Sequence, residues 1–400
     1  MTRPAQLTAS PALPATPWIA VGVVVAAGII GALQVGKAVI VAPLLQADMH
    51  LGLAAIGRLV GVFSLLGLLG GLFAGVWTGR MGARRVLRLG LLIVLAGCVL
   101  GALSRDYEEL LWTRVIEGAG FLLITVAAPS ILGVLAAPSR RNLVMALWSC
   151  FMPAGMALAM LAGPWFESWR ALWWACAAMV ALALCAVFIA VPDAGMRRLQ
   201  PWRQLAGDAM ATLTARGPLL IAAIFGLYSL MFFALFSFLP VLLMERMNVT
   251  HQSAGELSAL AIAANILGNL AAGLLLSKGV PRALILAGAS LIMGASGLGI
   301  FVDVLPGTPA FLLCIVYAAV GGLIPATLLS AAPLAARNSI LVPLVMGLAM
   351  QGNNLGQIVG PMLVGSVIQY WSWSAAAIVA ASAAVVVVLI AKPAMDLPPR

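Results

Sequence analysis

Residues 75–85 read GVWTGRMGARR, and residues 273–279 read GLLLSKG. Each segment is a glycine-containing turn that carries a basic residue at a matching position, Arg80 or Lys278, and is set between two long apolar stretches. The two basic residues lie 198 positions apart, in a chain of 400 residues. Self-similarity at a constant spacing indicates that a chain is built from repeated structural units. The fold is therefore expected to follow from a duplication of about half the chain.

Three unrelated landmarks recur at nearly the same spacing. They are Pro43 with Pro240, Arg141-Asn142 with Arg337-Asn338, and Gly163-Pro164 with Gly360-Pro361. The alternative is a chance coincidence in a composition rich in glycine and proline. Four landmarks within two residues of one offset disfavour that alternative.

The composition assigns the repeated units to a membrane. Hydrophobic residues make up 63% of the chain and charged residues only 8%, which is more apolar surface than a soluble core of this size can hide. A lipid-facing β-barrel would need polar residues at every second position, and the long apolar runs show no such alternation. We therefore expect an all-α integral membrane protein.

About 20 residues are needed to cross the hydrocarbon core as a helix, and the chain offers twelve such stretches. The predicted spans are 18–45, 52–77, 86–104, 110–137, 142–164, 171–191, 218–242, 254–277, 282–302, 309–333, 340–368 and 373–391. Each copy of the repeat holds six spans, so both copies enter the membrane in the same orientation, and the substrate is expected between the two bundles.

The same pattern divides the chain into five segments: an N-terminal tail (1–17), a six-helix bundle (18–191), a linker (192–217), a second six-helix bundle (218–391) and a C-terminal tail (392–400). Sixteen of the 22 Lys and Arg residues lie in loops on one side of the predicted membrane, and three lie on the other. Basic loops face the cytoplasm. Both tails and the linker are therefore expected in the cytoplasm, with the chain in the inner (plasma) membrane.

The net charge of +10 does not indicate a nucleic-acid partner, because the basic residues are scattered between apolar stretches rather than gathered in a soluble domain. All five cysteines lie inside apolar stretches, so neither a disulfide framework nor a zinc site is indicated. The first apolar run exceeds a signal-peptide core and is expected to remain as the first span. No cofactor or metal is expected.

Three motifs resemble those of the major facilitator superfamily of transporters. The glycines Gly75, Gly79 and Gly82 with Arg80, Arg84 and Arg85 resemble the family's gating loop between its second and third helices, although Gly79 stands where an acid is usual. Arg114 to Gly120 resembles a second signature, an intramembrane arginine followed by a glycine pair. Residues 159–164 resemble part of the antiporter signature. The resemblance covers essentially the whole chain and implies two pseudo-symmetric six-helix bundles that transport a solute.

A looser likeness points to the cyanate and nitroimidazole porter branch. It rests on residues 226–240, on Met350-Gln351 and on Gly360-Pro361. The first span departs from that branch in the position of its basic residue, so the subfamily is left unassigned. Gly163, Pro164, Gly356, Gly360 and Pro361 are expected to serve helix packing.

Charges within the spans are the first candidates for function, because each costs roughly 2.5–3.5 kcal/mol at the centre of a membrane helix. Arg114 and Glu117 are three residues apart and share one helix face, which allows mutual neutralisation. A structural brace and a role in proton coupling are both open for this pair. Glu117 is the one acid well inside any predicted span and is the best single proton carrier.

The charged residues within the spans leave an excess of positive charge in the first half, which favours an anionic substrate. Lys37, with Gln34 beside it, is the leading substrate contact; Arg58 is a further candidate, although it lies near the outer end, where snorkelling to the surface is the better interpretation. Amides and one phenol complete the expected site. They are Tyr228, Asn265, Gln351, Asn354 and Gln357. Helix–helix hydrogen bonding is the alternative role for them.

The function expected from these observations is secondary active transport by alternating access, as a symporter or antiporter. The expected partners are a small organic or inorganic anion, protons and the lipid bilayer, and the chain is expected to work as a monomer. Proton-coupled efflux of amphiphilic drugs is the alternative. An intramembrane enzyme would need paired catalytic or metal-binding residues at membrane depth, and a channel would need a filter or charged ring; the sequence contains neither.

Overall fold

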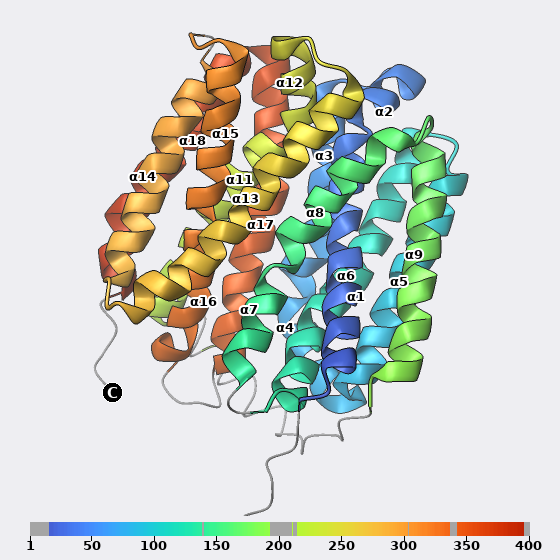
Figure 1. The fold of residues 1–400 in the computed structure, drawn as a ribbon, viewed down its shortest axis with the longest axis vertical. Coiled ribbons are helices and arrows are strands. Elements are labelled where there is room, and N and C mark those ends of the chain that lie inside the picture. Colours follow the sequence, from blue (N-terminus) through green and yellow to red (C-terminus); the bar gives the residue numbers. More distant parts are fainter. Residues whose placement is uncertain are drawn as a thin grey trace, which may run out of the picture.

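A computed structural model describes residues 16–137, 140–192, 210, 214–302, 304–336 and 342–395, and it is all-helical over these residues (Figure 1). Most of the expected linker (192–217) and of both tails lies outside the described residues. The first half runs through α1 (Trp18–Ile40), α2 (Ala42–Met49), α3 (Leu53–Gly61), η1 (Val62–Ser64), α4 (Leu65–Met81), α5 (Ala83–Leu103), α6 (Tyr107–Leu135), α7 (Arg141–Ser149), α8 (Phe151–Ala162), η3 (Gly163–Trp165) and α9 (Trp169–Ala190).

The second half repeats this order. It runs through α11 (Arg216–Phe236), α12 (Leu239–Met247), α13 (His251–Ser277), α14 (Arg282–Phe301), α15 (Gly307–Gly321), α16 (Leu323–Ala335), α17 (Val342–Tyr370) and α18 (Trp373–Met395). Ten stretches of the described chain are long and apolar enough to cross a membrane. The consecutive pair α7–α8 and the amide-bearing, 29-residue α17 bring the number to the expected twelve.

Backbone geometry supports the duplication independently of the sequence motifs. In the described part of the chain, φ is positive at Gly82 (85°) and Gly279 (80°), and at His50 (53°) and Asn248 (51°). The members of each pair lie 197 or 198 positions apart. The glycines end α4 and follow α13 in the left-handed region, which side chains other than Gly rarely adopt. The two copies therefore share their turns as well as their helices.

The first span of each half is broken near one end, where a proline begins a new helix. Pro43 and Pro240 occupy the first turns of α2 and α12, where a missing backbone N–H costs nothing. The first predicted span, 18–45, is therefore two helices that meet at Val41. These breaks lie at one end of the molecule, which carries α2 and α12 (Figure 1); we call it the α12 end.

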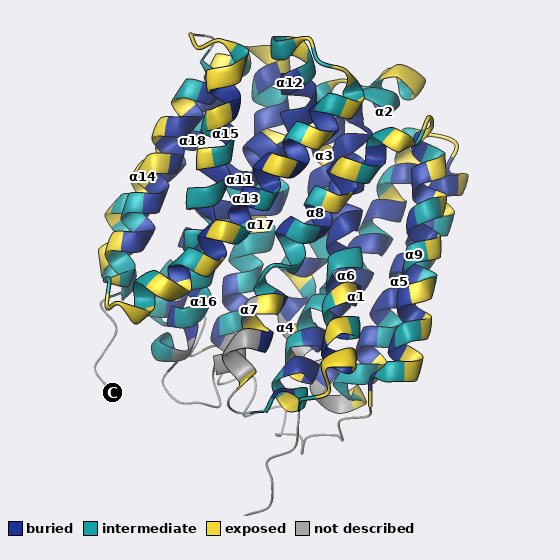
Figure 2. Ribbon diagram, viewed as in Figure 1, coloured by how far each residue is buried: buried dark blue, intermediate teal, exposed yellow. Residues whose placement is uncertain are grey.

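The interior is packed while the periphery stays apolar. Buried residues run along the inward faces of the helices, and exposed residues lie on their outward faces (Figure 2). Large apolar side chains remain exposed on those outward faces, among them Leu182, Ile189 and Leu389 at 69–87%. A soluble protein rarely presents so much apolar surface, whereas a bilayer covers it. This pattern makes the chain a multi-pass membrane protein.

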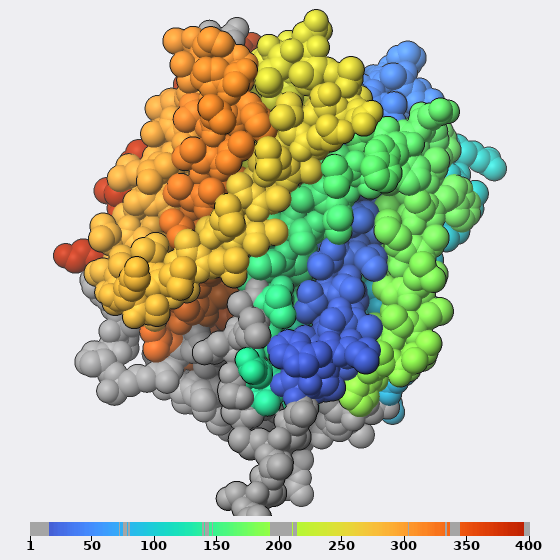
Figure 3. Space-filling model, in the orientation of Figure 1, coloured from blue at the N-terminus to red at the C-terminus, as the bar shows by residue number. Residues whose placement is uncertain are grey.

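The two halves meet along two pairs of helices. In the first, α13 packs against α8, and the two lie side by side across the surface in Figure 3. In the second, α17 packs against α3 and α4. We call this interface the seam. Each pair joins the second span of one half to the fifth span of the other, as a twofold-related duplication requires.

Candidate functional site

Three charged side chains are fully buried inside the first half. Lys37 projects from α1, and Arg114 and Glu117 project from α6. Lys37 Nζ lies 2.7 Å from Glu117 Oε1, and Arg114 Nη1 donates to Glu117 Oε2. One carboxylate thus bridges two cations, with one oxygen for each. We call these three residues the charge cluster.

The walls of the charge cluster come from α1 itself and from two more helices, α5 and α9. Lys37 Nζ lies 3.4 Å from Cys98 Sγ of α5 and 4.3 Å from the ring centre of Trp173 of α9. Cys98 in turn donates to Gln34 Oε1 of α1 at 3.2 Å. An aromatic face attracts a cation, most strongly when both are shielded from water. The cluster is therefore enclosed by polarisable groups and by the helices of one half.

The charge cluster carries one uncompensated positive charge when all three groups are ionised. Among the described residues, the buried Lys, Arg, Asp and Glu side chains are those of Lys37, Arg114 and Glu117. Nε and Nη2 of Arg114 are buried without a hydrogen-bond acceptor in the described part of the chain. Burying a guanidinium with two unpartnered nitrogens costs free energy. A negative group beside these nitrogens would supply the missing hydrogen-bond acceptors and offset the excess positive charge.

The second half has no such cluster at the matching positions. Shifting Lys37, Arg114 and Glu117 by 197 residues leads to Ala234, Phe311 and Cys314, and all three are buried. The duplication therefore keeps the helices and changes the chemistry. Whatever the charge cluster does, one half performs it.

Amide and hydroxyl groups cross the seam beside the charge cluster. Ser64 Oγ of η1 donates to Gln357 Oε1 of α17 at 2.7 Å. Gln351 Nε2 of α17 donates to the Leu68 carbonyl of α4 at 3.0 Å. Gln351 and Gln357, both predicted substrate ligands, therefore join the two halves in this conformation.

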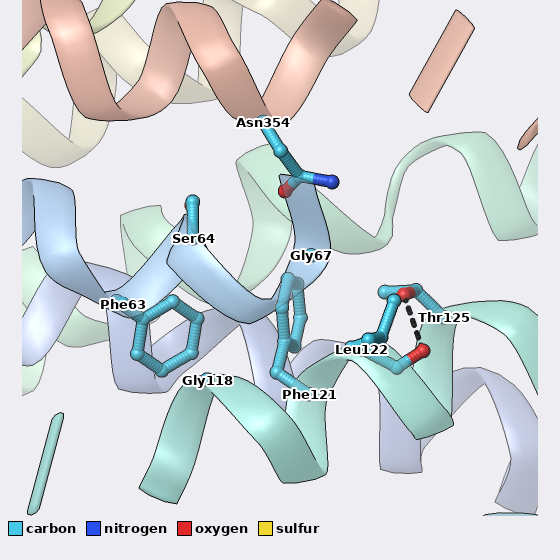
Figure 4. A pocket seen from close by; sticks show the side chains of 8 residues that line it. All are labelled: Phe63, Ser64, Gly67, Gly118, Phe121, Leu122, Thr125 and Asn354. Atoms are coloured by element: carbon cyan, nitrogen blue, oxygen red, sulfur yellow. Dashed lines mark hydrogen bonds between the residues drawn. The ribbon is translucent and has the colours of Figure 1, made fainter. Parts of the chain in front are cut away.

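A small pocket lies at the same level of the seam (Figure 4). The lining residues are Phe63, Ser64, Gly67, Gly118, Phe121, Leu122, Thr125 and Asn354. Asn354 approaches from α17, and the other residues approach from the opposite side on η1, α4 and α6. Its volume is about 10 Å³, room for about one water molecule. The pocket therefore leaves little free space between α17 and the first half at this level of the seam.

At the α12 end, two polar contacts span the seam. Gln369 Oε1 of α17 accepts from the Ala54 N–H at 3.0 Å and so caps the start of α3 from the other half. His251 Nε2 at the start of α13 lies 2.7 Å from the carbonyl oxygen of Ile40, the last residue of α1. The imidazole of His251 is thus part of a contact between the two halves.

A second polar group lies inside the other half. Asn265 Nδ2 of α13 donates to Tyr228 Oη at 3.2 Å and to the Ala318 carbonyl at 3.0 Å, and Asn269 Nδ2 donates to Asn265 Oδ1 at 2.9 Å. These contacts satisfy one another and hold α11, α13 and α15 together. In this conformation Tyr228 and Asn265 have the helix–helix role that the sequence leaves open.

The remaining predicted residues lie at the rim or in packing contacts. Arg58 is exposed on α3, with Nε 3.4 Å from Tyr107 Oη. In the gating loop, Arg84 donates to the Phe188 carbonyl of α9 at 2.8 Å, within its own half, and Arg85 is exposed. For Gly75, Gly79 and Arg80 the structure describes the backbone of α4 alone. The packing residues all lie against other helices: Gly163 against Ile40, Pro164 against Gly255, Gly356 against Gly226, Gly360 against Leu230 and Pro361 against Gly57.

The structure brings Lys37 to Glu117 rather than to the pocket. Lys37 and Gln34 are absent from the pocket lining, whereas Asn354 is part of it. Sequence reasoning also missed Cys98, Trp173 and Phe63 as neighbours of the buried charges. The sequence alone does not show that an apolar or aromatic residue packs against a buried charge.

Comparison with known proteins identifies the family. The family model described as Major Facilitator Superfamily matches residues 19–341. The chain is 26% identical over 322 residues to the 3-(3-hydroxy-phenyl)propionate transporter of Escherichia coli (strain K12), covering 76% of this chain and 75% of that one. It is 27% identical over 228 residues to the multidrug efflux protein YfmO of Bacillus subtilis (strain 168), and this match spans just over half of that relative, 56% of each chain.

A shorter sequence match and a solved structure agree with this. The chain is 32% identical over 122 residues to the cyanate transport protein CynX of Escherichia coli (strain K12), covering 28% of this chain and 32% of that one. The fold matches an inward-facing crystal structure of a bacterial homologue of the human lysosomal transporter Spinster with a TM-score of 0.71, at 17% identity over 94% of both chains. The chain is thus a transport protein rather than an enzyme, and it belongs to the Major Facilitator Superfamily.

Proposed function

We propose that this transporter moves a small organic or inorganic anion by alternating access and couples that movement to protons through the charge cluster. The observation that carries the proposal is the full burial of Lys37, Arg114 and Glu117 with one excess positive charge. Ionisable groups at membrane depth are expensive and usually functional. The cluster unites the residues expected to bind substrate and to carry the proton.

Proton coupling follows from the way Glu117 is shared. Its two oxygens face different helices, since Lys37 belongs to α1 and Arg114 to α6. A small relative movement of α1 and α6 would separate one cation from the carboxylate, and Glu117 could then take up a proton in its place. Such a change of partner would link a conformational step to a protonation step.

The anionic cargo follows from charge balance. An anion beside the charge cluster would offset its excess charge, which a cation would increase. Two of the relatives carry the names of anions, cyanate and 3-(3-hydroxy-phenyl)propionate. These names support the class of cargo, and the charge cluster supplies the physical reason.

Alternating access would operate across the seam. The contacts of Gln369 and His251 hold the α12 end closed, and the Spinster homologue of similar fold is described as inward-facing. The distribution of basic residues favours the α12 end as the outer side, the termini as cytoplasmic and the inner membrane as the location. A single copy has the two bundles that the mechanism needs, so we propose that a monomer is the working unit.

Proton-coupled efflux of amphiphilic drugs is the second candidate. It is favoured by the partial antiporter signature around Gly163-Pro164 and by the name of the Bacillus subtilis relative. A site for cationic drugs should present an acid near the cargo, whereas α1 presents Lys37. The two candidates therefore differ in the sign of the charge that they would transport.

The test is transport by proteoliposomes with an imposed pH gradient, using a panel of small anions and cationic dyes. We expect wild-type protein to move an anion in response to the gradient. Glu117→Gln should abolish the response to pH, and Lys37→Ala should impair it. Arg105→Lys is the matched control, because Arg105 is exposed in the turn between α5 and α6 and lies outside the charge cluster. Dye movement unaffected by Lys37→Ala, with no anion moved, would overturn the proposal in favour of efflux.

A further inference from the structure

Arg114 stands on the same stripe of α6 that lines the seam pocket. Gly118, Phe121, Leu122 and Thr125 of α6 form part of that lining. Their spacing is that of one helix face, and Arg114 lies four residues before Gly118, one turn along the same face. The guanidinium therefore belongs to a residue one helical turn beyond the pocket, on the face of α6 that lines it.

Phe63 separates the pocket from Arg114. Its ring lines the pocket, and the Arg114 guanidinium carbon lies 4.5 Å from the ring centre. The ring also packs against Phe121, with 5.2 Å between the two centroids. Phe63 is thus in contact with both the pocket and the cation, and a change in its side-chain rotamer would connect them.

The unpartnered nitrogens of Arg114 have a defined geometry. Glu117 accepts from Nη1, and the nitrogens without an acceptor among the described residues are Nε and Nη2. Nε and Nη2 form the lateral fork of a guanidinium, whose two parallel N–H groups match the two oxygens of a carboxylate. A spherical anion cannot use both donors in the same way.

We propose that Nε and Nη2 of Arg114 bind the carboxylate group of the transported anion, and that a change in the Phe63 side-chain rotamer exposes these two nitrogens to the pocket. This inference rests on the proposed function and narrows the cargo to small carboxylates. On binding, the carboxylate replaces the face of Phe63 as the partner of the guanidinium and offsets the excess charge of the cluster. Ser64 and Asn354, which line the pocket, are placed to contact the rest of the molecule.

The test is equilibrium binding to the purified full-length protein in detergent, followed by calorimetry and by thermal shift. The probes are acetate and benzoate, with acetamide and benzamide as neutral isosteres and chloride as a spherical anion. We expect the carboxylates to bind and to raise the melting temperature, and the amides and chloride to bind at least tenfold more weakly. Equal binding of the amides or of chloride would overturn the inference. That result would mean that the two nitrogens of the fork bind only water.

Two variants assign the binding to these residues. Arg114→Lys keeps the charge and removes the fork, so it should weaken carboxylate binding by roughly tenfold or more. Arg105→Lys, at an exposed residue between α5 and α6, should bind as wild type. Phe63→Leu removes the competing aromatic face and should bind about twofold to thirtyfold more tightly. Phe63→Leu is a conservative change, and it tests whether Phe63 limits access to Arg114 even if Arg114→Lys does not fold. Wild-type affinity in Arg114→Lys or in Phe63→Leu would contradict the proposal.

This binding test is independent of the gradient. Carboxylate binding that depends on Arg114, without pH-driven transport, would refute proton coupling and leave this inference standing. Transport driven by pH without carboxylate binding would refute this inference and leave proton coupling standing.

Discussion

The strongest prediction concerns the unequal contributions of the three buried charges to stability. Glu117→Gln leaves Lys37 and Arg114 buried without their shared partner, and raises the local charge from one to two. At 2.7 Å and an effective dielectric constant of about 20, the Lys37–Glu117 attraction alone is about 6 kcal/mol. Because removing the carboxylate also removes its desolvation cost, the expected net loss is about 3–5 kcal/mol.

Lys37→Met should behave differently. It keeps most of the side-chain volume and leaves Arg114 and Glu117 as a neutral pair, so the expected change is within about 1 kcal/mol of wild type. Combining Lys37→Met with Glu117→Gln leaves Arg114 as the one charge of the cluster. The double variant should therefore be more stable than Glu117→Gln alone, although it carries one change more.

The assay is a double-mutant cycle on the free energy of unfolding in bicelles, with transport measured in parallel. The cycle should give an interaction energy of at least about 1 kcal/mol between Lys37 and Glu117, within the range seen for residues in contact. The reasoning would be refuted if Lys37→Met destabilised the protein as much as Glu117→Gln does, or if the two changes were additive.

Three further predictions address the seam and the α12 end. Gly118→Ala would drive a methyl group against a backbone carbonyl of η1 and should cost about 1–3 kcal/mol in the free energy of unfolding, seen as a lower melting temperature. His251→Ala removes a contact with the Ile40 carbonyl across the seam and should lengthen spin-label distances between α2 and α12; unchanged distances would contradict a gating contact. The Trp169 indole N–H, 2.9 Å from Asp48 Oδ2, lowers the pKa of that carboxyl below its usual 3.8. This stabilisation is present above pH 3.8 and lost as the pH falls through the lowered pKa, so Trp169→Phe should lower the melting temperature at pH 6 and less at pH 3.

The fold could be predicted because its signals are local and repeated. Pro43 and Pro240 begin short helices in both halves, and the turn at Gly82 recurs at Gly279. Apolar length then accounts for ten of the spans in the described part of the chain. The break at Val41 was not predicted, because an apolar run of 28 residues looks the same whether its helix is continuous or interrupted.

The candidate site could be predicted only in part. The contact between Arg114 and Glu117 follows from their spacing on one helix, and the structure has an ion pair there. Lys37 lies 80 residues from Glu117 in the sequence, and its choice of partner depends on how α1 and α6 pack. Helix packing is a tertiary property, so a single sequence could not show that Lys37 turns toward Glu117.

The central claim is that binding of the anion and protonation of Glu117 are linked. It is tested most directly by counting protons taken up or released when benzoate is added to purified protein in weakly buffered detergent. We predict a proton exchange that saturates with benzoate and disappears in Glu117→Gln, while Arg105→Lys keeps it. The same proton exchange in Glu117→Gln as in wild type would contradict the account.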